Sequence, residues 1–416
     1  MKVVLAHKYF YRGGGTATYL FALMPELEKR GHECIPFTVA YDQTVPSKYS
    51  RYFVSPVAGS SQTHLKDMKK TPWLMLKLLA RATWSLEAYR KALQLCDELK
   101  PDIAYVHNLY SYMSPSPIAA FKKRGVPVVM RVSDASLLCP AYTGWLHGEV
   151  CVHCARNGPW RGLRYRCHKG SLSSTAARAL SAAVHRWLRI YDSVDTFVTP
   201  SQFMAELLAS GGYNHKPVVC IPSFYPSRCD LNGQVEGDYV LYFGRIAPYK
   251  GLATLIRAFI EVGRGYRLLL AGTDVDGETD RLRRLAVNVD SGAIEFAGPQ
   301  DREDLDELVR RCLFTVIPSE WAENSPMSVL EAFAHGKPVI GSDIGGIPEQ
   351  VAEGAGLLFP PGDVQALAER MSVLLASAEL RREMGQAAWH RVRTRFSPER
   401  HLDRLERVFG DIHRCC

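Results

Sequence analysis

Residues 318–349 read PSEWAENSPMSVLEAFAHGKPVIGSDIGGIPE and follow a short apolar run at 313–317. We expect the run 313–317 to form a strand and a polar loop to follow it. Ser325 and Pro326 then indicate the start of a helix, because proline suits the first helical position. A second strand is expected at 338–341, after this helix. The stretch therefore predicts one strand–helix–strand unit of a parallel sheet.

Two of the carboxylates in this unit are candidates for ligand binding, Glu323 in the expected loop and Glu331 in the expected helix. A loop carboxylate there can reach a sugar hydroxyl, and the helical one a ribose hydroxyl. The helix N-terminus at Ser325 and Pro326 would face a phosphate, since its N–H groups carry partial positive charge. The alternative for Glu331 is an ordinary exposed helix acid without a ligand.

The same alternation of strands and helices runs along the whole chain. Strands are expected in the first half at 2–6, 34–40, 103–107, 127–132, 194–198 and 218–221. In the second half they are expected at 239–243, 267–271, 294–297, 313–317 and 338–341. This pattern predicts an α/β protein with two Rossmann-like, doubly wound, mostly parallel sheets facing a central cleft.

The length and composition of the chain indicate two domains joined by a linker. Its 416 residues favour two domains, and an apolar fraction of 47% permits two ordinary cores. We expect an N-terminal domain at 1–221 and a linker at 222–238, where prolines, glycines and polar residues gather. A C-terminal domain at 239–396 would follow, and a last helix at 397–416 would return to the N-terminal domain.

The stretch YFGRIAPYKGLATLIRAF, residues 242–259, places two cations after a strand. Arg245 and Lys250 would lie at the carboxyl end of that strand and beside a helix N-terminus, which suits a diphosphate. The alternative is two surface charges in a loop.

A glycine run, Gly13 to Gly15, joins the first strand to a helix. Such a turn lets a ligand approach backbone N–H groups, and Gly14 and Gly15 are candidates for donor binding. The run lacks the spacing G-x-G-x-x-G, which disfavours a dinucleotide cofactor.

The net charge of +8 is concentrated between residues 121 and 190, where twelve Lys or Arg stand against Asp134 and Glu149. A solvated face is one explanation, and attraction of a phosphate-bearing acceptor or an anionic membrane is the other. A helix expected at 71–100, with Thr71 as its N-cap, is basic and amphipathic, so it fits either a membrane surface or the core. No nucleic-acid-binding motif accompanies the charge.

Localisation follows from what the sequence lacks. It has no apolar run of 18 residues and no signal peptide at its first residues, so we expect a cytoplasmic protein, in contact at most with the inner face of the membrane.

Taken together, these motifs resemble glycosyltransferase family 4, of the bacterial surface-polysaccharide type. The resemblance rests on the E-x7-E pair Glu323/Glu331, the GR…YKG pair Arg245/Lys250, the GGIPE turn at 345–349, the N-terminal glycines, and PDIAYVHN at 101–108 with His107.

The resemblance implies a GT-B fold and a retaining transferase that uses a UDP- or GDP-sugar and needs no catalytic metal. Glu323 would contact the donor sugar and Glu331 the ribose, while Arg245 and Lys250 would neutralise the leaving diphosphate. His107 would line the reaction centre, and the N-terminal domain would hold a glycan or lipid-linked acceptor. This chain has Ser133 before Asp134 where the family usually has histidine. The resemblance therefore implies less about acceptor binding than about donor binding.

Two other function classes share this architecture. A nucleotide-sugar 2-epimerase would need acid and base groups around the sugar but not this donor motif. The intact donor motif argues against a non-catalytic sugar-nucleotide-binding protein, and the departure at Ser133 is the feature that favours one.

Four cysteines fall inside a glycine-rich insertion at 138–171: Cys139, Cys151, Cys154 and Cys167. Their spacing, x11, x2 and x12, admits a tetrahedral thiolate site for one structural Zn²⁺. Disulfides are not expected in a cytosolic protein. A loop with four reduced thiols is the alternative.

Overall fold

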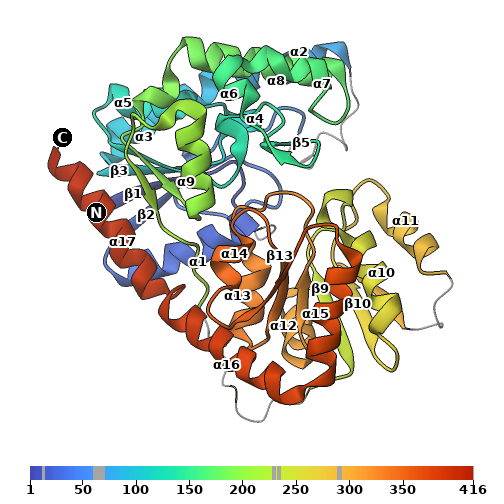
Figure 1. The fold of residues 1–416 in the computed structure, drawn as a ribbon. Helices are drawn as coiled ribbons and strands as arrows, with labels where there is room; N and C mark the ends of the chain where they lie inside the picture. Colours follow the sequence, from blue (N-terminus) through green and yellow to red (C-terminus); the bar gives the residue numbers. More distant parts are fainter. Residues whose placement is uncertain (12–14, 60–70, 227–230, 232–235, 288–292, 416) are drawn as a thin grey trace. The chain divides into compact units, whose positions relative to one another are not determined.

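The computed structural model describes residues 1–11, 15–59, 71–226, 231, 236–287 and 293–415. The chain forms two compact units (Figure 1), of which unit 1 is Met1–Pro222 with Leu402–Cys416 and unit 2 is Ser223–His401. Each unit contains a six-stranded sheet in which every pairing is parallel. The predicted fold class, two Rossmann-like α/β domains, is confirmed.

The sheet of unit 1 has the strand order β2-β1-β3-β4-β7-β8. Its strands are β1 (Lys2–Ala6), β2 (Glu33–Phe37), β3 (Ile103–His107), β4 (Val128–Arg131), β7 (Thr196–Thr199) and β8 (Val218–Cys220). The helices of this unit's first half are α1 (Gly15–Lys29), α2 (Pro72–Thr83), α3 (Leu86–Leu99), α4 (Tyr110–Met113) and α5 (Ser116–Lys123). The order reverses between β1 and β3, and ligands of such sheets bind outside the strands' carboxyl ends at that point.

A long insertion separates β4 from β7. It holds the hairpin β5 (Trp145–Leu146) and β6 (Glu149–Val150) and the helices α6 (His153–Asn157), α7 (Gly162–Tyr165) and α8 (Leu172–Trp187). After β7 comes α9 (Gln202–Leu208). Short 3-10 turns lie at Ser50–Tyr52, Ala135–Leu137, Pro159–Arg161 and Ile190–Ser193, and a π turn at Ala209–Tyr213.

The sheet of unit 2 has the order β11-β10-β9-β12-β13-β14. Its strands are β9 (Tyr239–Phe243), β10 (Arg267–Ala271), β11 (Ile294–Gly298), β12 (Thr315–Ile317), β13 (Val339–Ser342) and β14 (Gly356–Phe359). The helices are α10 (Leu252–Val262), α11 (Glu278–Leu285), α12 (Arg302–Arg311), α13 (Met327–Ala334), α14 (Ile347–Val351), α15 (Val364–Ala376) and α16 (Ala378–Thr394), and a 3-10 turn lies at Pro248–Lys250. The strand order reverses between β9 and β12.

Burial explains why these strands could be recognised. All five residues of β3 and all five of β9 are buried, so both strands read as nearly continuous apolar runs, as expected for parallel strands covered on both faces. The predicted strands 2–6, 239–243 and 267–271 are confirmed with the same bounds. Strand β14 and the hairpin β5–β6 were not predicted.

Helix α17 (Pro398–Cys415) spans the boundary between the units at residue 401. Its part from Leu402 belongs to unit 1, where Leu402, Leu405 and Phe409 are buried. Arg30 binds two acids of this helix, Asp403 at 2.7 Å and Glu406 at 2.8 Å.

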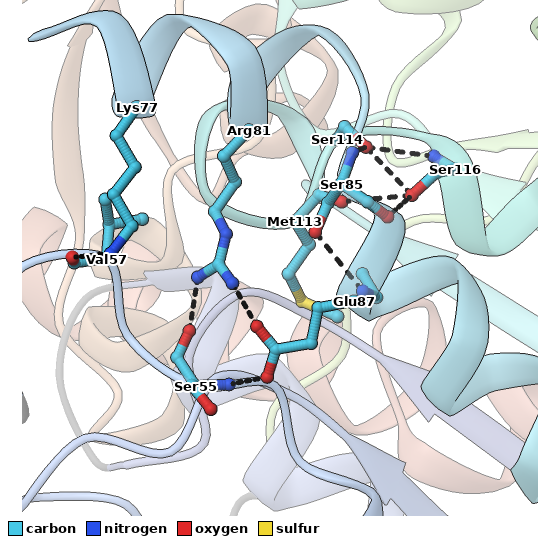
Figure 2. Close-up of polar contacts among 10 residues, drawn as sticks. Ser55, Val57, Lys77, Arg81, Ser85, Glu87, Met113, Ser114 and Ser116 are labelled. Carbon is cyan, nitrogen blue, oxygen red and sulfur yellow. Dashed lines mark hydrogen bonds and ion pairs between the residues drawn. The ribbon is translucent and has the colours of Figure 1, made fainter.

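The prediction of one continuous helix at 71–100 is wrong, because the structure has two helices there, α2 and α3. Thr71 caps α2 as predicted, by accepting a hydrogen bond from the Leu74 N–H. The chain then leaves the helical conformation at Trp84, and Ser85 caps α3 through the Ala88 N–H at 3.2 Å. Ser85 is fixed by Ser114 and Ser116, as Figure 2 shows: its N–H donates to the Ser114 hydroxyl at 2.9 Å and its carbonyl accepts from Ser116 at 2.8 Å.

The two cations of α2 contact the protein. Figure 2 shows Arg81 donating to the Ser55 carbonyl and pairing with Glu87, and Lys77 reaching the Val57 carbonyl at 3.2 Å. Trp73 and Leu76 of the same helix are 74% and 58% exposed. Helix α2 thus exposes part of its apolar surface to solvent, while Leu78 is buried and both cations contact the protein. None of the described helices is both long and apolar enough to cross a membrane.

Candidate functional site

The predicted donor residues of unit 2 follow the two strands between which the strand order reverses. Arg245 and Lys250 come after β9, and the loop with Glu323 comes after β12. Because parallel strands end at the same edge of a sheet, this order brings the two loops together. The structure unites Lys250 and Glu323, which are 73 residues apart in the sequence.

Glycines allow these loops to approach each other. Gly251 has φ +68°, and a Cβ atom there would lie 1.8 Å from the Pro318 carbonyl oxygen, so no other residue fits. Gly345, in the GGIPE turn, has φ +62°, and its Cβ would lie 2.2 Å from the Glu323 carbonyl oxygen. The next N–H, of Gly346, donates to that same oxygen at 2.7 Å. The turn therefore holds the backbone of Glu323 in place.

Lys250 and Glu323 form a largely buried ion pair. Their side chains are 15% and 12% exposed, and the Ser319 hydroxyl donates to the same carboxylate oxygen, Oε1, at 3.1 Å. Burial disfavours the charged carboxylate, but the Lys250 charge and the hydrogen bonds from Lys250 and Ser319 outweigh it and lower the pKa of Glu323. Glu323 is thus held as an anion beside a cation.

Glu331 lies on α13 and is only 13% exposed, which excludes the alternative of an ordinary exposed helix acid. Burial raises the pKa of Glu331, against the opposing effect of Arg302 at 3.4 Å. Arg302 also pairs with Asp306 at 2.7 Å. Sequence reasoning missed Arg302, because nothing in the pattern of α12 distinguishes it from Arg310 and Arg311 of the same helix.

Arg245 is exposed, and its backbone is fixed by the Tyr242 hydroxyl, which donates to the Arg245 carbonyl at 2.6 Å. Its guanidinium carbon lies 5.8 Å from the centre of the Tyr249 ring, and Tyr249 packs against Trp321 at 4.7 Å. No acidic side chain in the described part of the chain forms an ion pair with Arg245. Its charge is therefore available to an anionic ligand.

Ser325 and Pro326 precede α13, with Pro326 in the N-cap position; the prediction of proline inside the first turn was wrong by one residue. The buried Gln350 holds both residues, by donating to the Ser325 hydroxyl at 3.2 Å and to the Pro326 carbonyl at 3.4 Å. The first turn of α13 is therefore held firmly, and its N–H groups give this end of the helix partial positive charge.

In unit 1, His107 is the last residue of β3 and is completely buried. Its ring lies 4.3 Å from that of Tyr105 and 5.6 Å from that of Tyr19. Gly13 and Gly14 fall outside the described residues, and Gly15 is the first residue of α1. The partner of His107 on the neighbouring strand is Arg131, which is 2% exposed and donates to the Ile221 carbonyl at 3.1 Å.

A tyrosine cluster that sequence reasoning missed lies beyond the carboxyl ends of the first three strands. The ring of Tyr9 lies 5.1 Å from Tyr11, 5.9 Å from Tyr41 and 5.7 Å from Tyr112, and Lys8 reaches over it at 5.2 Å. A tyrosine after each of three strands was the signal that could have found it. Aromatic faces with hydroxyl groups are typical linings of ligand sites.

The cysteines predicted as zinc ligands lie in unit 1, and all are free thiols. Within the described ranges no three His, Cys, Asp or Glu side chains stand as a ready set of metal ligands. The predicted tetrahedral geometry is therefore not preformed.

Comparisons with known proteins place the chain among glycosyltransferases. The family profile described as Glycosyltransferase Family 4 matches residues 13–226, and the profile Glycosyl transferases group 1 matches residues 229–391. The chain is similar to a D-inositol 3-phosphate glycosyltransferase of Corynebacterium efficiens, at 33% identity over 39% of this chain and 40% of that protein. It is also similar to an exopolysaccharide phosphotransferase of Streptomyces coelicolor, at 31% identity over 47% of this chain and 21% of that protein.

Solved structures share the fold over the whole chain. Sucrose-phosphate synthase from Thermosynechococcus elongatus matches with a TM-score of 0.70 and 20% identity, covering 100% of both chains. The Anabaena protein HepE in complex with UDP-glucose matches with a TM-score of 0.66 and 16% identity, over 99% of this chain and 100% of that one. The curated relatives above are matched over less than half of their length.

Proposed function

Because the chain belongs to glycosyltransferase family 4, we propose that it is a hexosyltransferase that moves a sugar from a UDP- or GDP-sugar to a glycan or lipid-linked acceptor, with retention of anomeric configuration. The observation that carries the proposal is the Lys250–Glu323 pair at the point where the strand order of unit 2 reverses. The complex of HepE with UDP-glucose, a protein of the same fold, supports a nucleotide-sugar donor.

Sugar transfer from a nucleotide sugar requires cations at the leaving diphosphate and an anion near the sugar. Arg245 and Lys250 supply the cations, and the N-terminus of α13 adds the partial charge of its N–H groups. Glu323 accepts a hydrogen bond from a sugar hydroxyl and stabilises the positive charge that develops at the anomeric carbon. Glu331, held by Arg302, accepts a hydrogen bond from a ribose hydroxyl. These groups perform the reaction without a catalytic metal.

On the acceptor side we assign His107 to the reaction centre and the tyrosine cluster around Tyr9 to the acceptor sugar. A precursor of surface polysaccharide fits this assignment.

We further propose contact of unit 1 with the inner face of an anionic membrane through α2 and α8, which lie side by side: the Thr83 and Ser181 hydroxyls meet at 2.9 Å. Trp187, the last residue of α8, is 80% exposed, and Trp73 of α2 is 74% exposed. Tryptophan is typical of membrane–water interfaces.

The test is turnover of α-linked UDP- and GDP-sugars, with water or a monosaccharide as acceptor, followed by release of free nucleotide and by NMR of the anomeric proton. We expect nucleotide release with one donor, and an α-anomer as the first product before the free sugar equilibrates. An epimer without free nucleotide would indicate a 2-epimerase, and binding without any product a non-catalytic protein. A β-linked first product would overturn retention.

A further inference from the structure

Arg302, the first residue of α12, contacts carboxylates on two helices of unit 2. Its Nη1 atom lies 3.4 Å from Oε1 of Glu331 on α13. Its Nη2 and Nε atoms lie 2.7 and 3.1 Å from the two oxygens of Asp306, one turn further along α12. Such a two-point pairing fixes the plane of a guanidinium, and here it leaves Nη1 for Glu331.

Two further side chains hold this arrangement. The guanidinium carbon of Arg302 lies 5.3 Å from the centre of the Tyr225 ring, within the range of a cation–π contact. His335, which directly follows α13, is 7% exposed, and its Nε2 atom lies 3.2 Å from Asp306 Oδ1. The side chain of Arg302 is 43% exposed, so these contacts rather than burial fix its position.

Glu331 depends on Arg302 for its charge. Burial raises the pKa of Glu331, the charge and hydrogen bond of Arg302 oppose the rise, and the nearby Asp306 adds to it. Among the residues that the structure describes, Arg302 is the one hydrogen-bond donor to this carboxylate. Glu323 has a stronger support, since Lys250 pairs with it and the balance there lowers its pKa.

The contact with Arg302 occupies one oxygen of the Glu331 carboxylate. Oε1 faces Nη1 of Arg302, and no hydrogen bond within the described ranges reaches Oε2. An ionised carboxylate accepts hydrogen bonds only, so a fixed and charged Glu331 keeps Oε2 as an acceptor for a hydroxyl group. A protonated or rotated Glu331 would lose this preference.

We propose that Arg302 is a positioning residue that holds Glu331 as an acceptor for the ribose hydroxyls and so makes the site select ribonucleotides over deoxyribonucleotides, an inference that rests on the proposed function. Arg302 acts through Glu331 and does not itself contact the donor. Asp306 and Tyr225 keep Arg302 in place, and His335 keeps Asp306 in place.

The experiment is calorimetric titration of the full chain with UDP and GDP and with their 2′-deoxy and 3′-deoxy analogues. We expect the wild type to bind one of the two nucleotides at least about 10-fold more tightly than a deoxy analogue of it, because a hydrogen bond to a charged group is lost. Arg302→Gln should remove most of this preference. Arg302→Lys should restore part of it, since it keeps the charge without the planar fork. The control Arg310→Gln, an arginine of α12 that pairs with Glu307, should keep the preference of the wild type.

Two further measurements separate positioning from a structural role. In the Glu331→Gln background, Arg302→Gln should cause no further loss of preference, because the two residues act as one unit. Nucleotide affinity should fall with decreasing pH as Glu331 becomes protonated, and in Arg302→Gln this fall should occur at a higher pH. The reason is that removal of the cation leaves the effects of burial and of Asp306 on the Glu331 carboxyl unopposed.

Arg302→Gln protein that keeps the preference of the wild type would overturn the inference. Additive losses in the double variant would do the same, because they would show that Arg302 binds the donor by itself. If Arg302→Gln does not fold, Asp306→Asn replaces it, since it keeps the cation and weakens the fork, and an unchanged preference there would count against the proposal. Binding of neither UDP nor GDP would overturn the proposed function, whereas nucleotide binding without a preference for ribose would overturn this inference alone.

Discussion

At the scale of single residues, the candidate donor site depends on two charges and two glycines. The loops that carry Lys250 and Glu323 can approach each other because Gly251 lies against the Pro318 carbonyl and Gly345 against the Glu323 carbonyl, where no side chain fits. The sequence showed the two charges and their strands, but not that they would touch. The pairing arises from the strand order, in which β9 and β12 are neighbours although β10 and β11 lie between them in the sequence.

Removing either cation should weaken transfer. Hydrogen bonds to a charged group contribute about 1.5–3 kcal/mol, so we expect Arg245→Ala and Lys250→Ala each to lower kcat/KM by about 10- to 100-fold. Lys250→Ala should in addition lower thermal stability, since it leaves Glu323 buried without its partner. Arg382→Ala, an exposed arginine of α16, is the control and should leave both unchanged. Turnover at the wild-type rate in the Arg245 or Lys250 variant would contradict the assignment.

The two carboxylates should separate in their effects. Glu323→Gln keeps the size of the side chain and removes its charge, so we expect a large fall in kcat with nucleotide binding largely kept. Glu331→Gln should instead weaken binding of the free nucleoside diphosphate, measured by calorimetry. Glu303→Gln, an exposed acid of α12, serves as the control. If the effects of the first two variants were exchanged, the roles given to Glu323 and Glu331 would be wrong.

At the scale of secondary-structure elements, the helical pattern was recognised and its interruption was not. The periodicity from 71 to 100 continues through Trp84, and only the capping residue Ser85 marks a second start. What breaks the helix is distant in sequence: the hydroxyls of Ser114 and Ser116 bind the backbone of Ser85. The periodicity also did not show which face of α2 contacts the protein. Its cations Lys77 and Arg81 bind the carbonyls of Val57 and Ser55, a contact with a distant segment that the helical pattern does not indicate.

The exposed apolar side chains of α2 and α8 should bind an anionic membrane. We expect the variant Trp73→Ser, Leu76→Ser, Trp187→Ser to bind vesicles of anionic lipid roughly tenfold less tightly in a sedimentation assay, since it loses three large apolar contacts. Val373→Ser, which removes an exposed apolar side chain of unit 2, should bind like the wild type. Equal binding by the triple variant, or no binding by the wild type, would refute this contact.

At the scale of the whole molecule, the class of fold could be predicted and the connections could not. Buried parallel strands produce the apolar runs that a sequence displays, which is why β1, β9 and β10 were found with their bounds. Strand β14 was missed because three of its four residues, Gly356 to Leu358, are only partly buried and the run is too short. His107 and Arg131 lie on neighbouring strands, and both pack against the ring of Tyr19, which comes from helix α1. No local sequence pattern indicates that contact.

The division of the chain has a consequence for its synthesis on the ribosome. Unit 1 begins with the first strand, yet it includes the residues from Leu402 onward, and all of Ser223–His401 is made in between. At roughly 5–20 residues per second, those ~180 residues delay completion of unit 1 by about 10 to 40 s. During that time Arg30 has not yet met Glu406, and Tyr105 has not yet met Phe409, because both partners are still to be synthesised. The first unit to emerge is therefore the last to be finished, and a nascent chain halted in unit 2 would display an uncovered face of its first sheet to chaperones.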